Sequence, residues 1–138
     1  MTRTILLVED NPMDVDLTVR VLRRSTPAVH VEVARDGEEA LAWLERWRTG
    51  TALPILILLD LKLPRVDGLE VLREYKRDQH AGTIPVVVLT TSAEAADVRT
   101  AYALGANSYL VKPVEFEEFM ALAARVQQYW TVDNRLPF

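Results

Sequence analysis

Short apolar runs alternate with longer amphipathic segments along the whole chain. Five runs predict strands, over residues 4–8, 29–34, 55–59, 85–89 and 108–111. Three of them are nearly continuous Ile, Leu and Val, which is typical of strands buried on both faces of a parallel sheet. Each segment between two runs, and the segment after the last one, carries apolar residues at three- and four-residue steps and therefore predicts a helix.

Capping residues indicate where the first three helices begin. Asn11 followed by Pro12 is an N-cap with proline at the first helical position. Asp36, with Glu39 three residues later, resembles a capping box. A third helix is predicted to begin near Asp67.

The last two helices are predicted from Ser92 and Glu115. Ser92 can cap an alanine-rich helix that stops at Gly105, because glycine readily adopts the left-handed conformation of a helix C-terminus. Glu115 opens the last helix, whose apolar stripe predicts a face packed on the sheet. That face contains Phe116, Phe119 and Val126.

Five consecutive strand–helix units predict an α/β fold. Because crossovers between parallel strands are right-handed, helices should cover both faces of the sheet and form a three-layer α/β/α sandwich. A chain of 138 residues has room for one domain, placed at residues 1–130, with residues 131–138 as a C-terminal tail. A composition that is 49% hydrophobic and 26% charged excludes a disordered chain.

Charge and cysteine content exclude several classes of function. A formal net charge of −4, without a long basic run, argues against binding to nucleic acid phosphates. The absence of cysteine excludes disulfides, thiol nucleophiles and cysteine-ligated metals. The N-terminal apolar run is too short for a signal peptide or a membrane span, so we expect a cytoplasmic protein.

Polar residues that suit phosphoryl chemistry follow the predicted strands. Glu9 and Asp10 follow the first strand, Asp60 the third, Thr90 the fourth and Lys112 the fifth. In an open parallel sheet these ends lie along one edge, where ligands bind. Three neighbouring carboxylates favour a hard divalent cation, and the lack of cysteine or histidine there favours Mg²⁺. A metal, an ammonium and a hydroxyl around a free carboxylate suit phosphoryl transfer to that carboxylate.

These residues, in this order and spacing, resemble the CheY-like receiver domain of two-component response regulators over about residues 3–130. The resemblance implies a sheet of order 2-1-3-4-5. It implies that Asp60 is the nucleophile that accepts a phosphoryl group from a sensor histidine kinase. It also implies that Mg²⁺ is bound by Asp10 and Asp60 directly, by Glu9 through water, and by the backbone carbonyl of Lys62.

The same resemblance assigns roles to four further positions. Lys112 should hold a phosphoryl oxygen, and Thr90 should hydrogen-bond to the phosphoryl group and draw its loop inward. Tyr109 matches the aromatic switch residue of the family. Lys62 and Ser92 should modulate the lifetime of the phosphoryl group, and we expect Lys62→Ala to change that lifetime several-fold in a direction the sequence leaves open.

Local segments narrow the resemblance to a subfamily. The stretches LTTSAEAADV, GANSYLVKPVEFEEF and YWTVDNRLP are similar to the stand-alone response regulators of bacterial and cyanobacterial phytochromes. The resemblance implies a phytochrome-type kinase as partner and an output through another, unknown protein. Thr131 departs from the subfamily pattern, which often has an apolar residue after the Tyr-Trp pair.

Three other functions share part of this pattern. An aspartyl-phosphate phosphohydrolase acting on a small substrate would use similar groups, but its nucleophile normally ends the first strand in an Asp-x-Asp pattern. A flavodoxin-like electron carrier would share the fold and carry a yellow flavin. A pseudo-receiver scaffold would lack the complete set of acidic residues and lysine that this chain retains.

Apolar residues at the C-terminus predict a homodimer. The last helix is apolar on more than one face, and the tail that follows would have nothing to pack on in a monomer. A two-fold contact in which each tail lies on its partner would bury the same patch twice. The residues placed in this interface are Phe119, Trp130, Leu136 and Phe138. The alternative is a tail that folds back on its own domain.

Overall fold

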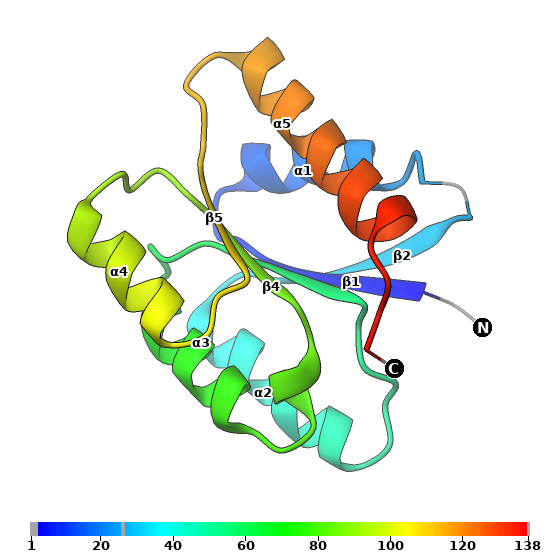
Figure 1. Cartoon of the computed structure of the whole chain (residues 1–138), viewed down its shortest axis with the longest axis vertical. Coiled ribbons are helices and arrows are strands. Elements are labelled where there is room, and N and C mark those ends of the chain that lie inside the picture. The colour runs from blue at the N-terminus through cyan, green and yellow to red at the C-terminus, as the bar shows by residue number, and fades with distance from the viewer. Residues whose placement is uncertain (1–2, 26, 138) are drawn as a thin grey trace.

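The computed structural model describes residues 3–25 and 27–137. Within these residues the chain forms a five-stranded parallel sheet of order β2-β1-β3-β4-β5 (Figure 1). The strands are β1 (Arg3–Val8), β2 (Val29–Ala34), β3 (Leu56–Leu59), β4 (Val86–Thr90) and β5 (Ser108–Val111). The sheet has the predicted order and type, and each observed strand lies within one residue of its predicted bounds.

Helices cover both faces of the sheet, as Figure 1 shows. The helices are α1 (Pro12–Leu22), α2 (Gly37–Arg48), α3 (Gly68–Arg77), α4 (Ala95–Ala103) and α5 (Phe116–Gln128). A short 3-10 helix, η1 (Ala81–Thr83), precedes β4, and a π-helical turn, η2 (Tyr129–Asp133), continues α5. Helices α1 and α5 pack together on one face, whereas α2, α3 and α4 lie on the other.

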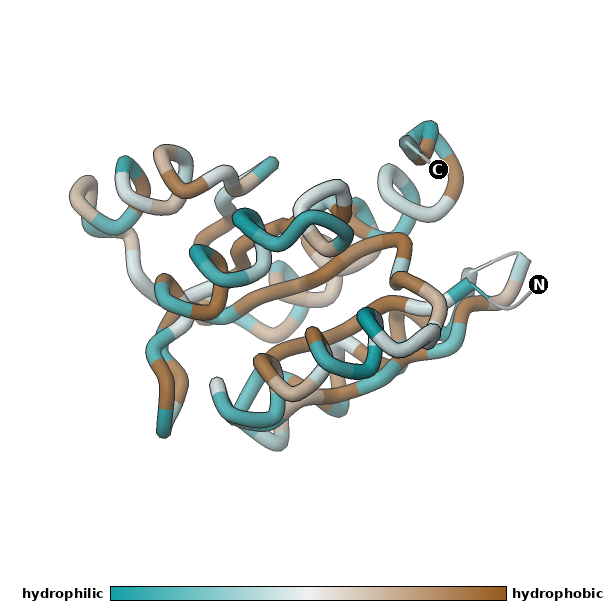
Figure 2. Tube along the Cα trace, turned by 90° about the horizontal axis from the view of Figure 1, so that it is seen from below, coloured by the Kyte–Doolittle hydropathy of each residue, from teal (hydrophilic) through white to brown (hydrophobic). Residues whose placement is uncertain are grey.

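The buried strands separate two apolar cores because successive side chains point to opposite faces. In β1, Leu6 and Val8 join the core under α2 and α3, while Ile5 and Leu7 join the core under α1 and α5. Strand β3 divides in the same way, so its continuous run of apolar residues is buried on both sides. Figure 2 shows these hydrophobic strands between helices of mixed hydropathy. No helix in the described part of the chain is long and apolar enough to cross a membrane.

The helix starts predicted from capping residues are present for the first three helices. Asn11 accepts hydrogen bonds from the backbone N–H groups of Met13 and Asp14, and Asp36 accepts one from Glu39. Asp67 caps α3. The prediction for α4 was wrong: the helix begins at Ala95 after Glu94, and the Ser92 hydroxyl instead binds an acidic side chain.

Two expectations about the C-terminal region were also wrong. Phe116 is exposed, because it is the first residue of α5 and belongs to neither apolar core. The tail does pack on its own domain: Trp130 and Leu136 contact the core under α1 and α5. Arg3 also donates a hydrogen bond to the carbonyl of Thr131, so the start of β1 holds the chain end in place.

Candidate functional site

The sheet brings the candidate residues to one edge. Backbone hydrogen bonds extend the strand ladder by one residue at three positions, from Glu9 N to Ala34 O, from Asp60 N to Val8 O and from Lys112 N to Thr90 O. These bonds fix the backbone directly at the candidate residues Glu9, Asp60 and Lys112. The site therefore has the rigidity of the sheet although its residues lie at loop starts.

Glu9, Asp10 and Asp60 form a cluster of carboxylates with one oxygen of each within 4.8 Å of the others. Asp10 is exposed, whereas Glu9 and Asp60 are buried. Three hard oxygen donors at this spacing, open to solvent on one side, fit a divalent cation that keeps some of its waters. The structure thus brings together the side chains that the sequence placed in a metal site.

Lys112 balances the acidic cluster from inside the protein. Its ammonium lies 2.5 Å from Oε1 of Glu9, 2.9 Å from Oδ2 of Asp14 and 3.0 Å from Oδ2 of Asp60. Asp14 was missed by the sequence analysis. It lies in the first turn of α1, and only the docking of that helix beside the sheet brings it to Lys112.

Burial and charge shift the pKa values of Glu9 and Lys112. The pKa of Glu9 is raised from 4.5 to about 7, chiefly because the carboxyl group is buried; the hydrogen bond with Lys112 opposes this shift and the charge of Asp60 adds to it. Burial by itself lowers the pKa of Lys112, but hydrogen bonds to Glu9 and Asp14 and nearby carboxylate charges hold it above its ordinary value. Lys112 therefore stays charged at neutral pH, and a cation at the cluster would favour the ionised form of Glu9.

The Asp60 carboxylate is held at both oxygens. Oδ2 faces Lys112, and Oδ1 accepts a hydrogen bond from the backbone N–H of Lys62 at 3.1 Å. Behind it, a Cβ on Gly68 would lie 2.4 Å from the Asp60 carbonyl oxygen, so only glycine permits this approach of α3. The carboxylate is thereby oriented before any partner arrives.

The β4–α4 loop places a second set of polar groups beside Asp60. Thr90 is fully buried at the end of β4. The Tyr109 hydroxyl, from β5, donates a hydrogen bond to the carbonyl of Ser92 at 2.9 Å. The Ser92 hydroxyl lies 2.5 Å from Oδ2 of Asp97, a residue that the sequence analysis also missed.

The residues placed in a dimer interface differ in their surroundings. Phe119 is 5% exposed and belongs to the interior of the domain, so it is not available to a partner. Trp130 and Leu136 are partly buried on their own core, and Phe138 lies outside the described residues. The apolar side chains that are exposed near them are Tyr129 and Val132.

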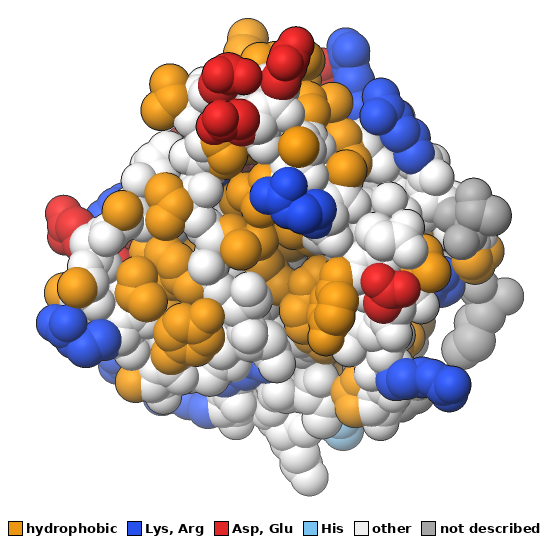
Figure 3. Space-filling view, turned by 45° about the horizontal axis from the view of Figure 1, so that its top comes forward, with side chains coloured by type: hydrophobic (Ala, Val, Ile, Leu, Met, Phe, Trp, Pro, Cys, Tyr) orange, Lys and Arg blue, Asp and Glu red, His pale blue; other side chains and the backbone are white. Residues whose placement is uncertain are grey.

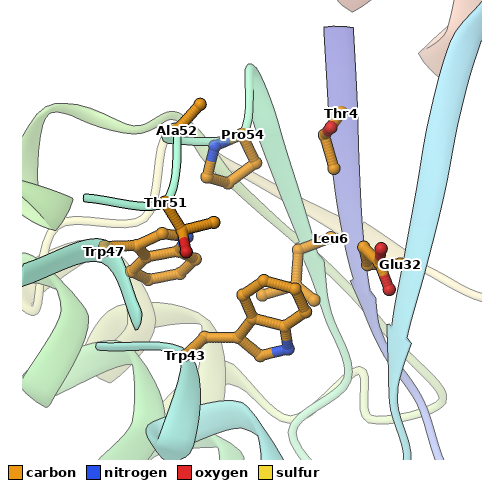
Figure 4. A pocket seen from close by; sticks show the side chains of 8 residues that line it. All are labelled: Thr4, Leu6, Glu32, Trp43, Trp47, Thr51, Ala52 and Pro54. Atoms are coloured by element: carbon orange, nitrogen blue, oxygen red, sulfur yellow. The ribbon is translucent and has the colours of Figure 1, made fainter. Parts of the chain in front are cut away.

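A pocket of about 290 Å³ lies at the opposite end of the sheet, where β1 begins (Figure 4). Its lining residues are Thr4, Leu6, Glu32, Trp43, Trp47, Thr51, Ala52 and Pro54. Trp47 packs on buried Tyr75, and Arg46 stacks on Trp43. Glu32 is paired with His30 at 2.7 Å. The contacts of Trp43 and Trp47 therefore account for both side chains as packing groups.

Comparisons with known proteins agree with this geometry. The response regulator receiver domain family matches residues 5–124. A probable methanogenesis regulatory protein, FilR2 of Methanothrix harundinacea, is 45% identical over 96% of this chain and 86% of its own length. Response regulator Rcp1 of Synechocystis is 39% identical over 98% of this chain and 93% of its own length.

Solved structures of similar proteins share the whole fold. The phosphorylated cyanobacterial phytochrome response regulator RcpA has a TM-score of 0.94 at 38% identity, over all of both chains. The Mn²⁺-bound form of Rcp1 has a TM-score of 0.93 at 39% identity, over 99% of both chains. With a matching family over most of its length and relatives that share its fold, this chain belongs to the response regulator receiver domain family.

Proposed function

We propose that this receiver accepts a phosphoryl group on Asp60 from a histidine kinase and transmits the signal by a change of conformation. The observation that carries the proposal is the setting of the Asp60 carboxylate. It lies between the ammonium of Lys112 and the backbone N–H of Lys62, beside a three-carboxylate cluster that fits a divalent cation. A carboxylate fixed next to cationic groups suits nucleophilic attack on phosphorus.

The proposed transfer uses Asp60 as nucleophile. A carboxylate oxygen forms a bond to phosphorus while the phosphorus–nitrogen bond of a phosphohistidine breaks, and the imidazole leaves. Lys112 is close enough to Asp60 to hold one oxygen of the transferred group. The Thr90 hydroxyl, at the end of the neighbouring strand, would hydrogen-bond to another.

The proposed metal is Mg²⁺, which supplies positive charge against the phosphoryl oxygens when it is bound. Asp10 and Asp60 would bind it directly, Glu9 through water, and the backbone carbonyl of Lys62 would complete the protein ligands. The oxygen-only donor set supports this choice. The Mn²⁺-bound structure of Rcp1 supports a divalent cation in a relative of this protein.

The proposed switch connects Thr90 to the surface of α4, β5 and α5. A phosphoryl group adds about −1.5 to −2 charges and three acceptor oxygens at Asp60, which favours a state in which Thr90 moves toward it. The Tyr109 hydroxyl donates a hydrogen bond to the Ser92 carbonyl, so a movement of the β4–α4 loop would be transmitted directly to β5. Lys62, whose backbone N–H binds Asp60, and Ser92, in the loop after β4, would set the lifetime of the phosphoryl group.

A phytochrome-type histidine kinase is the proposed partner. The support comes from relatives, since RcpA is described as a phytochrome response regulator and aligns over the full length of both chains. FilR2 is described as a probable methanogenesis regulatory protein. The test should therefore compare a phytochrome-type histidine kinase with a histidine kinase of another type. Transfer from an autophosphorylated phytochrome kinase that is fast and specific would support this partner.

The function is tested by phosphorylation with acetyl phosphate and Mg²⁺, followed by intact-mass measurement. We expect the protein to gain one phosphoryl group, and Asp60→Asn to gain none. Asp16→Asn is the control, because Asp16 is an exposed residue of α1 paired with Arg20. Equal phosphorylation of Asp60→Asn and the unmodified protein would contradict the assignment.

A further inference from the structure

Asp97 joins the two loops that border Asp60. Its Oδ2 lies 2.5 Å from the hydroxyl of Ser92 and 3.6 Å from the ammonium of Lys62. Lys62 follows β3 and Ser92 follows β4, which are neighbouring strands of the sheet. One carboxylate oxygen on α4 therefore connects both loops at the edge where Asp60 lies.

This contact also anchors α4. The helix has nine residues, among which Ala101 is buried, and its N-cap, Glu94, makes no side-chain hydrogen bond to the helix. The backbone N–H of Glu94 instead donates to the Ser92 hydroxyl at 3.3 Å. The first turn of α4 is thus fastened by Ser92 and Asp97 rather than by its own cap.

Lys62 lies on the open side of Asp60. Its backbone N–H binds Oδ1 of Asp60, and its side chain, 60% exposed, runs from there to Asp97. The opposite side of Asp60 is closed by Lys112 and Glu9, which are buried. Solvent can therefore approach a group on Asp60 along the side that the exposed Lys62 side chain occupies, as well as past the exposed Asp10.

We propose that Asp97 is a positioning residue that holds the Lys62 side chain across the open side of phosphorylated Asp60 and so slows its hydrolysis. The inference rests on the proposed function of Asp60. In the hydrolysis, a water oxygen forms a bond to phosphorus and the bond between phosphorus and the Asp60 oxygen breaks. The products are the free Asp60 carboxylate and inorganic phosphate, which takes up the water oxygen with both protons and releases one of them to solvent according to the pH.

The structure gives this contact a second consequence. Because Asp97 is part of α4, any movement of the Ser92 loop toward a phosphoryl group changes the Ser92–Asp97 contact. The same movement releases or tightens Lys62. Asp97, which positions the Lys62 side chain, thus links the lifetime of the phosphoryl group to the position of α4.

The test compares the decay of the phosphorylated protein in four forms: unmodified, Asp97→Asn, Lys62→Ala and the double variant. Each is phosphorylated with acetyl phosphate, freed of donor, and followed by intact mass in Mg²⁺. Because an exposed ion pair contributes little free energy, we expect each single substitution to speed dephosphorylation by about two- to five-fold. The double variant should decay no faster than the faster single variant, because both substitutions remove the same contact.

Controls separate positioning from folding. Glu94→Gln removes a neighbouring charge without touching Lys62 and should decay like the unmodified protein, whereas Asp97→Glu keeps a carboxylate and should restore at least part of the lifetime. If Asp97→Asn does not fold, Asp97→Glu tests the position of the carboxylate, and unchanged decay of Lys62→Ala still overturns the inference, because the exposed Lys62 side chain can be removed without loss of the fold. Unchanged decay in either single variant, or effects that multiply in the double variant, overturns the inference. Failure of the unmodified protein to gain a phosphoryl group would instead reject the proposed function.

Discussion

Lys112 is a buried ammonium surrounded by the carboxylates of Glu9, Asp14 and Asp60. The ionised carboxylates repel one another, and the positive charge of Lys112 offsets this repulsion. In the proposed transfer, the same charge would hold an oxygen of the phosphoryl group. At the scale of single residues, Lys112 therefore contributes both to the stability of the fold and to the proposed phosphoryl transfer.

Removing this charge should destabilise the protein. We expect Lys112→Met to lower the free energy of unfolding by about 3 kcal/mol at pH 7, because it leaves buried carboxylates without their partner. Millimolar Mg²⁺ should restore part of the loss by supplying a cation at the acidic cluster. Urea unfolding with and without Mg²⁺ measures both effects, and an unchanged midpoint would mean that the cluster needs no internal cation.

The exposed carboxylate of the cluster should matter for the metal alone. Asp10→Asn is expected to weaken Mg²⁺ binding at least about tenfold, since Mg²⁺ is held by few protein ligands and each carries much of the affinity. Because Asp10 is exposed, stability without metal should change by less than about 0.5 kcal/mol. Isothermal titration measures the affinity, with Asp16→Asn as control. An unchanged isotherm for Asp10→Asn would place the metal elsewhere.

At the scale of the elements, side chains at helix ends connect neighbouring segments. Asp78 follows α3, accepts hydrogen bonds from the backbone N–H groups of His80 and Ala81 at 2.9 Å, and pairs with Arg48 of α2 at 2.8 Å. Its pKa is held below the ordinary 3.8, first by the hydrogen bond from Ala81 and also by Arg48, while burial opposes the shift. The folded state therefore favours the ionised form of Asp78.

This preference predicts a pH dependence with a definite sign. The stabilisation from Asp78 is fully present above its unfolded pKa of 3.8 and is lost as pH falls through the lower folded value. We expect Asp78→Asn to cost about 1 kcal/mol of unfolding free energy at pH 7 and progressively less below pH 3.8. Urea titrations at several pH values compare the two proteins. A difference that persists undiminished at the lowest pH would show that the carboxylate charge contributes nothing.

At the scale of the whole molecule, apolar side chains remain exposed on the face formed by α4, β5 and α5 (Figure 3). A groove of about 380 Å³ lies between β5 and α5 and is bordered by Tyr129 and Trp130. Tyr129, on its border, and Val132, three residues later in η2, are each about half exposed. Large exposed apolar groups in one place are typical of interfaces, so we propose that the homodimer forms through this end of α5.

Substitution of the two exposed residues tests the dimer. Tyr129→Ser with Val132→Ser should weaken self-association at least about tenfold, because it removes apolar area without disturbing the core. Sedimentation across a concentration series measures it, with Met13→Ser, a substitution of an exposed residue at the start of α1, as control. Deleting residues 131–138 should weaken the dimer as well, but also lower stability, because Leu136 packs on the core. A protein that is monomeric at about 100 μM in both phosphorylation states would rule the dimer out.

Much of the fold could be predicted because it depends on local patterns. Continuous apolar runs mark strands buried on both faces, and Asn11, Asp36 and Asp67 cap helices through contacts within a few residues. The main site residues follow from the same logic, since each ends a strand and parallel strands end at one edge. Ser92 shows the limit of this reasoning: it was expected to cap α4, but its hydroxyl binds the side chain of Asp97 instead.

The sequence by itself determined the order of the elements and the sheet edge at which Glu9, Asp10, Asp60 and Lys112 meet, because these depend on periodicity and on where the strands end. The resemblance to receiver domains singled out Asp60 as the proposed nucleophile. Tertiary structure alone decided which groups outside the strand ends reach the site. Asp14 meets Lys112, and Asp97 meets Lys62, only after helices have docked on the sheet. It also decided that Leu136 would pack on its own domain, since no local pattern records where a chain end folds back. Contacts between distant segments depend on the angle and depth at which helices pack, and the sum of many small packing energies fixes these.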